Sequence, residues 1–430
     1  MNGEQSVSAS TNDTDFTNSA VGASDRRETL PLLTLAFGWG FLVTGLIVGG
    51  GLGNGLALPD LIAATAIGNT INFIIAALIA YIGFFTGCNS ALLFRAIYGL
   101  KGGRLPVLAI VALTICWQGI IVGAFGFAFA QSFESGAFYA TAIFGGLLFT
   151  ATTYFGVRGL ELVSLPAAII LVVVGLYAGW INIAGAGGWP AFLQLSEATA
   201  AESPISLTQG INLVVGSWIV GAIVMPEYTR FAKKAWVAIA IPFIVMIIAQ
   251  WFLQILGALG GVVSGSYDFT TYMLAQGAVV GVIGVLAMAV ALWTTGDTNL
   301  YLPSVHLASE FRQSQKRMTV VCGVIGTILG LGIYAHFIEW IDLLASLAPP
   351  LIGPLLVEFY LLKRRDFAPD EAGKMIWNWR AYVAYACGAG STFVAFDAVP
   401  SSIVGLGVAA LVYLLLNAVR GAQSTLRAGT

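Results

Sequence analysis

The segment Trp293–Tyr301, WTTGDTNLY, places hydroxyl, carboxyl and amide side chains inside one of the most apolar parts of the chain. Asp297 lies 15 residues before Arg312, which is roughly 22 Å along a helix that rises ~1.5 Å per residue. A carboxylate at that depth in a bilayer is costly and normally faces a cavity or a partner. We therefore expect Asp297 to have a function; the alternative is a buried acid, bonded to threonine hydroxyls, that fixes helix packing.

Thr294 and Thr295 precede this acid and are adjacent, so their hydroxyls diverge by ~100° on a helix. Both can still reach one cation that lies between this helix and another helix whose backbone is opened. Hydroxyl and carbonyl oxygens are hard ligands, which suit sodium. A threonine in a membrane helix also commonly bonds the carbonyl four residues earlier, so the pair predicts either a sodium site or ordinary packing.

Glycine-interrupted spans are possible partners for this site. Gly38, Gly40 and Gly45 lie in the first apolar run, and Gly216 and Gly221 lie in the sixth. Opened spans at corresponding positions of two repeats indicate a binding site near the middle of the membrane, where free backbone N–H and C=O groups meet a ligand and a cation. Glycine also serves helix packing, which is the alternative.

Two tryptophans, Trp117 and Trp218, lie near the middle of the third and sixth runs. Their faces could hold a planar ligand between them, because stacking adds on the order of 1 kcal/mol for each aromatic contact. The alternative is ordinary packing, which we assign to Trp39, Trp251 and Trp293. The cysteines Cys88, Cys116, Cys322 and Cys387 are isolated, so we expect no metal site and no disulfide framework.

The composition identifies the elements that must position these residues. Hydrophobic residues make up 58% of the 430 and charged residues 9%, and the mean hydropathy is +0.88. Recurring runs of ~20 apolar residues are long enough to cross ~30 Å of hydrocarbon as helices. We expect an all-α polytopic membrane protein with twelve spans near 31–57, 60–86, 106–131, 137–156, 161–184, 209–228, 236–262, 279–309, 318–335, 338–361, 381–397 and 401–419.

The basic residues predict the orientation of these spans. All 19 Lys and Arg residues fall on the side of the N-terminus, whereas the opposite loops, including residues 185–206, hold only acids. The positive-inside rule then places both termini in the cytoplasm. Residues 1–28 are polar, with no apolar run, and we expect a disordered cytoplasmic tail without a signal peptide.

Four sequence blocks are similar to the cytosine permeases of the nucleobase–cation symporter-1 family, and the resemblance extends from about residue 30 to residue 420. They are GGGLGNGLALPD with IGN after it, VVGSWIVGAIVMPEYTRFAKKA, LWTTGDTNLY and LASLAPPLIGPLLVEFYLLKRR. The resemblance implies a five-plus-five inverted repeat with two added helices. Its parts would be residues 29–200 with an outer loop, residues 201–365, and residues 366–430 with a short cytoplasmic tail.

The resemblance also implies roles for individual residues. Sodium would be held by Thr294, Thr295 and the carbonyls of Ala291, Gly38 and Leu42. Trp117 and Trp218 would stack on the two faces of the ligand, and the backbone of Gly216 and Ser217 would bind its edge. This chain departs from the family where amides would read a pyrimidine: Gly296, Thr298 and Thr114 stand in their places. The room at Gly296 and the charge of Asp297 favour a different or larger heterocycle.

We therefore expect a sodium-coupled symporter for a nucleobase or similar planar N-heterocycle, in a bacterial-type inner membrane, and not an enzyme. A hydantoin- or allantoin-like ligand, a thiamine-precursor pyrimidine and proton coupling are alternatives. A rival class is an intramembrane aspartyl protease using Asp268 and Asp297, although its Gly-x-Gly-Asp pattern fails at Thr295. A passive channel would need repeated polar rings. The partners expected are sodium, the ligand and the lipid bilayer, without a cofactor, a nucleic acid or an obligatory protein partner.

Overall fold

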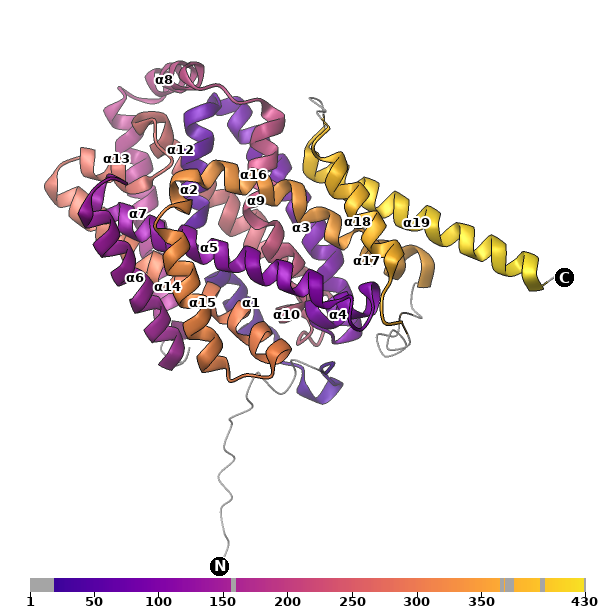
Figure 1. Cartoon of the computed structure of the whole chain (residues 1–430). Helices are drawn as coiled ribbons and strands as arrows, with labels where there is room; N and C mark the ends of the chain where they lie inside the picture. Colours follow the sequence, from indigo (N-terminus) through magenta and orange to yellow (C-terminus); the bar gives the residue numbers. More distant parts are fainter. Residues whose placement is uncertain (1–18, 156–159, 364–366, 368–374, 395–398, 429–430) are drawn as a thin grey trace, which may run out of the picture.

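The computed structural model describes residues 19–155, 160–363, 367, 375–394 and 399–428, and the regular secondary structure in these ranges is helical apart from one isolated bridge between Arg27 and Ala232. Figure 1 shows the helices gathered in one bundle, with α18 and α19 at its side. Within the described residues, nine helices are long and apolar enough to cross a membrane, and a bent pair brings the number to ten.

The spans, in chain order, begin with α1 (Thr29–Gly40) and α2 (Thr44–Gly55) as one bent span, followed by α3 (Leu58–Thr86), α5 (Arg104–Ala130), α6 (Gly136–Phe155) and α7 (Leu160–Gly185). The sixth span is α9 (Leu207–Ile223) with α10 (Pro226–Thr229), and the seventh is α11 (Ala235–Pro242) with η4 (Phe243–Gln250) and α12 (Trp251–Ser264). The remaining spans are α14 (Ala278–Phe311), α15 (Gln315–Gly330), α16 (Phe337–Leu347) with the short segments that flank it, α18 (Trp379–Ser391) and α19 (Ser401–Ala428).

The two spans beyond those ten are α15 and α18, which have 16 and 13 residues. Both are shorter than the ~20 residues that a straight crossing needs. Together with the bent pair they bring the chain to the twelve spans that the sequence predicts. Three shorter helices lie between spans: α4 (Ser90–Tyr98), α8 (Trp189–Glu202) and α13 (Phe269–Ala275).

The first span is interrupted, as its glycines predict. Residues Phe41–Val43 separate α1 from α2, and the two halves meet at an angle of 41°. The amide of Leu42 donates to the oxygen of Gly40 (2.9 Å), whereas a continuing helix would direct it to Gly38. The interruption therefore changes which carbonyl groups of α1 are bonded.

Glycines let α2 lie directly against α12. A Cβ atom on Gly49 would lie 2.0 Å from the carbonyl oxygen of Gln254, and one on Gly257 would lie 2.0 Å from the oxygen of Leu46. Small residues at such positions allow the close backbone approach that is typical of helix pairs in membranes. This explains the glycine-rich run GGGLGNG and fixes α2, the second half of the broken span, to the seventh span.

The spans form two packing groups. In the first, which we call the α9 bundle, α1, α2, α3, α9, α10, α11, η4 and α12 pack mainly on one another. In the second, the α5 bundle, α5, α6, α14 and α15 do the same. Few contacts join α5 to α9, so the two bundles face each other across a less closely packed region. Both halves of the sequence contribute to each bundle.

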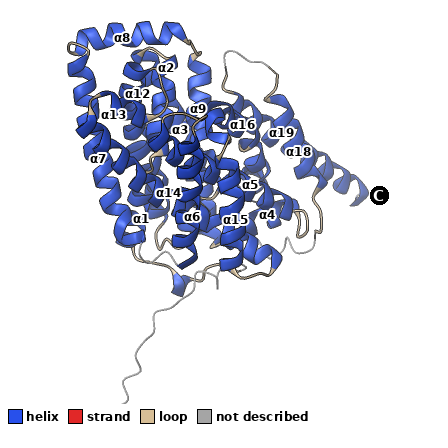
Figure 2. Ribbon diagram, turned by 60° about the vertical axis from the view of Figure 1, so that its left-hand side comes forward, coloured by secondary structure: helices blue, strands red, loops and turns tan. Residues whose placement is uncertain are grey.

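Two segments differ from the sequence expectation. The outer loop at residues 185–206 contains α8, which lies across one end of the molecule (Figure 2). Residues 19–28, expected in a disordered tail, pack against the bundle: Val21 donates to Gly87 O, and Arg26 donates to Phe84 O and Ala232 O. Phe84 lies in the last turn of α3, where carbonyl groups lack intrahelical donors, and Ala232 lies in the connection between α10 and α11. Residues 1–18 lie outside the described part of the chain.

Candidate functional site

A cavity lies between the two bundles. Its volume is about 650 Å³ when the space open to solvent is included. The α5 bundle contributes α5 and α14, and the α9 bundle contributes the broken first span, α9 and α10. The lining residues are Trp39, Leu42, Thr44, Thr114, Trp117, Ile121, Ser217, Trp218, Val220, Gly221, Val224, Tyr228, Thr295, Thr298, Asn299 and Leu302.

Indole rings approach this cavity from both bundles. Trp117 comes from α5 and Trp218 from α9, and both are largely buried. Trp39 packs edge-on against Trp218 with ring centroids 5.3 Å apart, and its own ring lies 4.4 Å from that of Tyr228. A Cβ atom on Gly221 would lie 2.6 Å from the Trp218 ring, so a glycine is needed for that ring position. The walls suit a flat aromatic ligand.

The polar side chains of the cavity mainly offer hydrogen-bond acceptors. The hydroxyls of Thr114, Ser217 and Thr298 donate to carbonyls of their own helices, at 2.7, 2.7 and 2.9 Å. The Nδ2 of Asn299 donates to Thr114 O (2.9 Å) and Gln118 Oε1 (3.1 Å). Because these protons are used inside the protein, the oxygens of these side chains are what remains for a ligand.

Two of the residues expected to bind sodium, Leu42 and Thr295, line this cavity. The hydroxyl of Thr294 donates to Ala291 O (3.0 Å), whereas Thr295 Oγ1 is buried without a hydrogen-bond partner. Leu42 lies in the interruption of the first span. Gly38 lies in the last turn of α1. A buried oxygen without a partner is costly, and a cation bound there would satisfy it, so the donor set fits a small monovalent ion.

Asp297 and Gly296 do not line the cavity, in contrast to the expectation. Asp297 is completely buried against α6, where Oδ1 accepts from Thr152 Oγ1 (2.6 Å) and Thr153 Oγ1 (3.2 Å). A Cβ atom on Gly296 would lie 2.7 Å from the Phe149 ring. Asp297 therefore joins α14 to α6 within the α5 bundle, which is the packing role that the sequence offered as the alternative. Gly296 gives no room to a ligand.

The backbone of Gly216 and Ser217 was expected to bind the edge of the ligand, and the structure places both residues inside a regular helix. The helix α9 is continuous through both residues, and the interruption of the sixth span comes at Val224 and Met225, before Pro226. A Cβ atom on Gly216 would lie 2.2 Å from Ile341 O, so this glycine permits packing on α16. Their backbone amides belong to a regular helix and are not free for a ligand. Ser217 reaches the cavity only through its side chain.

Sequence reasoning missed Asn299, Trp39 and Tyr228 as cavity residues. For Asn299 a signal existed, because it follows Thr295 by four residues and so lies on the same helix face. Trp39 and Tyr228 became cavity residues through the bends at Phe41 and Pro226. No spacing rule in the sequence specifies the directions of these bends.

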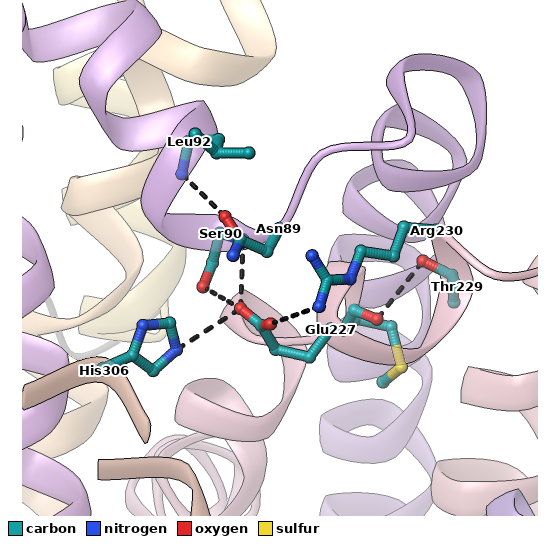
Figure 3. Close-up of polar contacts among 8 residues, drawn as sticks. Asn89, Ser90, Leu92, Glu227, Thr229, Arg230 and His306 are labelled. Carbon is teal, nitrogen blue, oxygen red and sulfur yellow. Dashed lines mark hydrogen bonds and ion pairs between the residues drawn. The ribbon is translucent and has the colours of Figure 1, made fainter. Parts of the chain in front are cut away.

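A buried acid joins the bundles near the face where α4 and the first residues of α1 lie, which we call the N-terminal face (Figure 3). Oε1 of Glu227, on α10, accepts from Ser90 N (3.1 Å) and Ser90 Oγ (2.6 Å) at the start of α4. His306 Nε2, on α14, lies 3.4 Å from Oε1, and Arg230 lies 3.9 Å from Oε2. We call these four residues the Glu227 cluster. Cavity residues Leu302 and Tyr228 are its neighbours along the chain.

A second buried acid lies towards the opposite end, beside α13. Asp268 caps this helix by accepting from Thr270 N (2.9 Å) and from the Thr270 hydroxyl, and it accepts from Tyr334 Oη (2.7 Å). Gln131, the C-cap residue of α5, donates to Thr270 Oγ1 (2.8 Å). We call Gln131, Asp268, Thr270 and Tyr334 the Asp268 cluster. Burial raises the pKa of the Asp268 carboxyl above its ordinary value.

Comparisons with known proteins show which family the chain is similar to. A model for the family described as permeases for cytosine/purines, uracil, thiamine and allantoin matches residues 22–416. The cytosine permease of Escherichia coli O157:H7 is 31% identical over 414 residues, covering 96% of each chain. The hydantoin permease of Microbacterium maritypicum is 23% identical, covering 89% of this chain and 84% of the relative.

Solved structures share the fold. The inward-facing conformation of Mhp1 has a TM-score of 0.81 at 20% identity and covers 94% of this chain and 93% of its own. Mhp1 in a closed conformation with bromovinylhydantoin bound, described as a nucleobase-cation-symport-1 family transporter, has a TM-score of 0.78 at 20% identity, covering 95% and 96%. The likeness confirms the predicted all-α fold with its inverted repeat and twelve spans.

The match extends over almost the whole chain, and the family consists of permeases, so the prediction that the protein is not an enzyme is confirmed. The comparisons do not identify the residues that select the ligand and the coupling ion. The chain belongs to the nucleobase–cation symporter-1 family of membrane transporters and resembles its cytosine permeases.

Proposed function

We propose that the protein imports a nucleobase or similar planar N-heterocycle together with sodium, by alternating access across a bacterial-type inner membrane. The observation that carries the proposal is the buried, unpartnered hydroxyl of Thr295, on the wall of a cavity lined by Trp117 and Trp218. The interrupted first span reaches the same cavity through Leu42. Family membership supports the transport of a small heterocycle.

Sodium would be held by the hydroxyls of Thr294 and Thr295 and by the carbonyl oxygens of Ala291, Gly38 and Leu42. These oxygens carry no formal charge, so a divalent ion would be poorly compensated in a low-dielectric site. The ion would join α14 of the α5 bundle to the broken span of the α9 bundle. Sodium then favours the conformation in which the two bundles hold the substrate, and by linkage the substrate raises the affinity for sodium by the same factor.

The acceptor-rich walls favour a ligand with N–H donors along its edge. Oxygens of Thr114, Ser217, Thr298 and Asn299 are available to such donors. A ligand that lacked the donors would leave buried acceptors unpaired, which costs about 1–3 kcal/mol for each group. Cytosine, purines and hydantoins all present N–H groups. A hydantoin- or allantoin-like ligand, or a thiamine-precursor pyrimidine, is the alternative substrate, and protons are the alternative coupling ion.

Release towards the cytoplasm would require the Glu227 cluster to separate. The cluster lies next to Leu302 and Tyr228 of the cavity and connects α10 with α4 and α14. The N-terminal face is the cytoplasmic face in this proposal, because the basic residues gather there in the sequence. In the structure, the bonds of Glu227 hold the two bundles together on that side.

Replacing Thr294 and Thr295 together by alanine tests the proposal. We expect the double variant to lose sodium stimulation of uptake, because two of the ligands to the ion are removed. The measurement is uptake in proteoliposomes with and without a sodium gradient, for cytosine, adenine, hydantoin and a thiamine-precursor pyrimidine. Thermal shifts of the purified protein with the same compounds report binding, because ligands stabilise the folded state that they bind.

Thr319→Ala is the matched control, because Thr319 is equally buried in α15 and donates to Gln315 O of its own helix, outside the cavity. This variant should retain wild-type sodium stimulation. Equal stimulation in the wild type and the Thr294→Ala, Thr295→Ala variant would contradict the assignment. Uptake driven by a proton gradient and indifferent to sodium would favour the alternative coupling ion.

A further inference from the structure

Gln250 is a buried amide at the interruption of the first span. It ends η4, the π-helical part of the seventh span, and none of its surface is exposed. Its Nε2 donates to the carbonyl oxygen of Gly40 at 2.6 Å. Gly40 is the last residue of α1, and α2 begins at Thr44. The bond therefore reaches the chain where its helical hydrogen bonding stops.

The hydrogen bonds at this interruption decide which oxygens remain for a cation. A helix ends with carbonyl groups that have no donor within the helix. Phe41 N donates to Phe37 O (3.2 Å), and Leu42 N donates to Gly40 O (2.9 Å) and not to Gly38 O. With the amide of Gln250, the oxygen of Gly40 accepts two bonds. The oxygen of Gly38 is thereby left without the donor that a continuous helix would supply.

Packing holds the Gln250 amide against both halves of the broken span. A Cβ atom on Gly45, in the first turn of α2, would lie 2.8 Å from Gln250 Oε1. On the other side, a Cβ atom on Gly40 would lie 2.8 Å from the Cβ of Ala249. Both glycines are thus required for this close approach. The amide lies between the end of α1 and the beginning of α2, and its position depends on the two helices together.

We propose that Gln250 is a positioning residue of the sodium site, a role that rests on the proposed sodium coupling. By binding Gly40 O it holds the turn at Phe41–Val43, so that the oxygens of Gly38 and Leu42 face Thr295. Gln250 is absent from the cavity lining and acts only through the first span. Its loss would leave Gly40 O with one donor fewer in an interior without water, where the turn can relax towards a regular helix.

The chain offers a matched control in Gln254, which follows Gln250 by one helical turn. Gln254 is also completely buried, and its Oε1 accepts from Asn69 Nδ2 at 2.6 Å. This bond joins α12 to α3 and makes no contact with the interruption. Substitution at Gln254 therefore removes a buried amide of the same type from the same span and leaves the donor to Gly40 in place.

The experiment compares Gln250→Met and Gln254→Met, because methionine keeps the volume of glutamine without its donor. Sodium is titrated against the thermal unfolding temperature of the purified proteins, and against uptake of the best ligand from the compound screen. We expect Gln250→Met to need about tenfold more sodium for half-maximal effect, as the loss of a buried hydrogen bond predicts. Its maximal uptake at saturating sodium should stay near that of the wild type, and Gln254→Met should keep the wild-type sodium requirement.

The outcomes separate this role from the proposed function. A sodium response of Gln250→Met equal to that of the wild type would overturn the role of Gln250 alone. Equal shifts in Gln250→Met and Gln254→Met would assign the effect to general packing and would also overturn it. A wild-type protein indifferent to sodium would overturn the proposed coupling, and the role of Gln250 with it. If Gln250→Met fails to fold, Gln250→Leu, which also lacks the donor to Gly40 O, provides the same comparison with Gln254→Leu.

Discussion

Glu227 and Asp268 are both buried acids that join helices around the cavity, one towards each end of the molecule. Glu227 meets the cationic side chain of Arg230 and the imidazole of His306, together with the hydroxyl and amide of Ser90. Among the described residues, the side-chain partners of Asp268 are the uncharged hydroxyls of Thr270 and Tyr334. The two clusters therefore join helices on the two sides of the molecule with different chemistry.

This difference indicates how each end can separate. A charged pair in a low-dielectric interior is stabilised mainly by its partner, so removing one member leaves a costly buried charge. An acid surrounded by neutral donors depends on individual hydrogen bonds, each of which contributes about 1 kcal/mol. We therefore expect the Glu227 end to respond strongly to the loss of charge, and the Asp268 end to respond weakly.

Glu227→Gln is the strongest test of this comparison. The glutamine keeps an acceptor for Ser90, but the buried guanidinium of Arg230 then faces a neutral group. We expect the free energy of unfolding to fall by about 3 kcal/mol, measured by chemical denaturation in mixed micelles. Glu28→Gln is the control, because Glu28 is exposed and pairs with Lys233 at the surface, where no measurable change is expected. Equal stability of Glu227→Gln and wild type would contradict a charge-dependent closure.

Asp268→Asn should have a smaller effect. The asparagine oxygen can still accept from Thr270, while its amide cannot accept from the hydroxyl of Tyr334. We expect a loss of about 1 kcal/mol, the contribution of one hydrogen bond, in the same denaturation assay. Tyr334→Phe removes the same bond from the other side, so the double variant should lose less than the sum of the single variants. Additive losses, or a loss as large as that of Glu227→Gln, would remove the distinction between the clusters.

The pH dependence of stability gives the finest test. Because burial raises the pKa of the Asp268 carboxyl, folding favours the protonated acid. Its contribution is fully present below the ordinary aspartate pKa and is lost as the pH rises through the raised pKa. Between about pH 4, near the ordinary aspartate pKa, and neutral pH, wild type should lose stability relative to Asp268→Asn. A difference that is constant across this range, or that grows in favour of wild type, would contradict the raised pKa.

The positions of polar residues along α14 show how much of the site could be predicted from the sequence. Thr295, Thr298, Asn299 and Leu302 line the cavity because they recur at the spacing of one helix face. Asp297 follows Thr295 by two residues, ~200° around the helix, and so points to the opposite side. The prediction that Asp297 belongs to the ligand site rested on its residue type. Its angular position on the helix, which the sequence also contains, points away from the cavity.

The sequence by itself determined that this chain crosses a membrane many times, where the spans lie, and which short blocks carry polar groups into them. It could do so because hydrocarbon excludes unpaired polar groups, so composition and run length are nearly sufficient. Only the tertiary structure decided which polar groups share a cavity. The directions of the bends at Phe41–Val43 and Val224–Met225, the partner of Asp297 on α6 and the approach of Gln250 to Gly40 all depend on packing between segments far apart in the sequence.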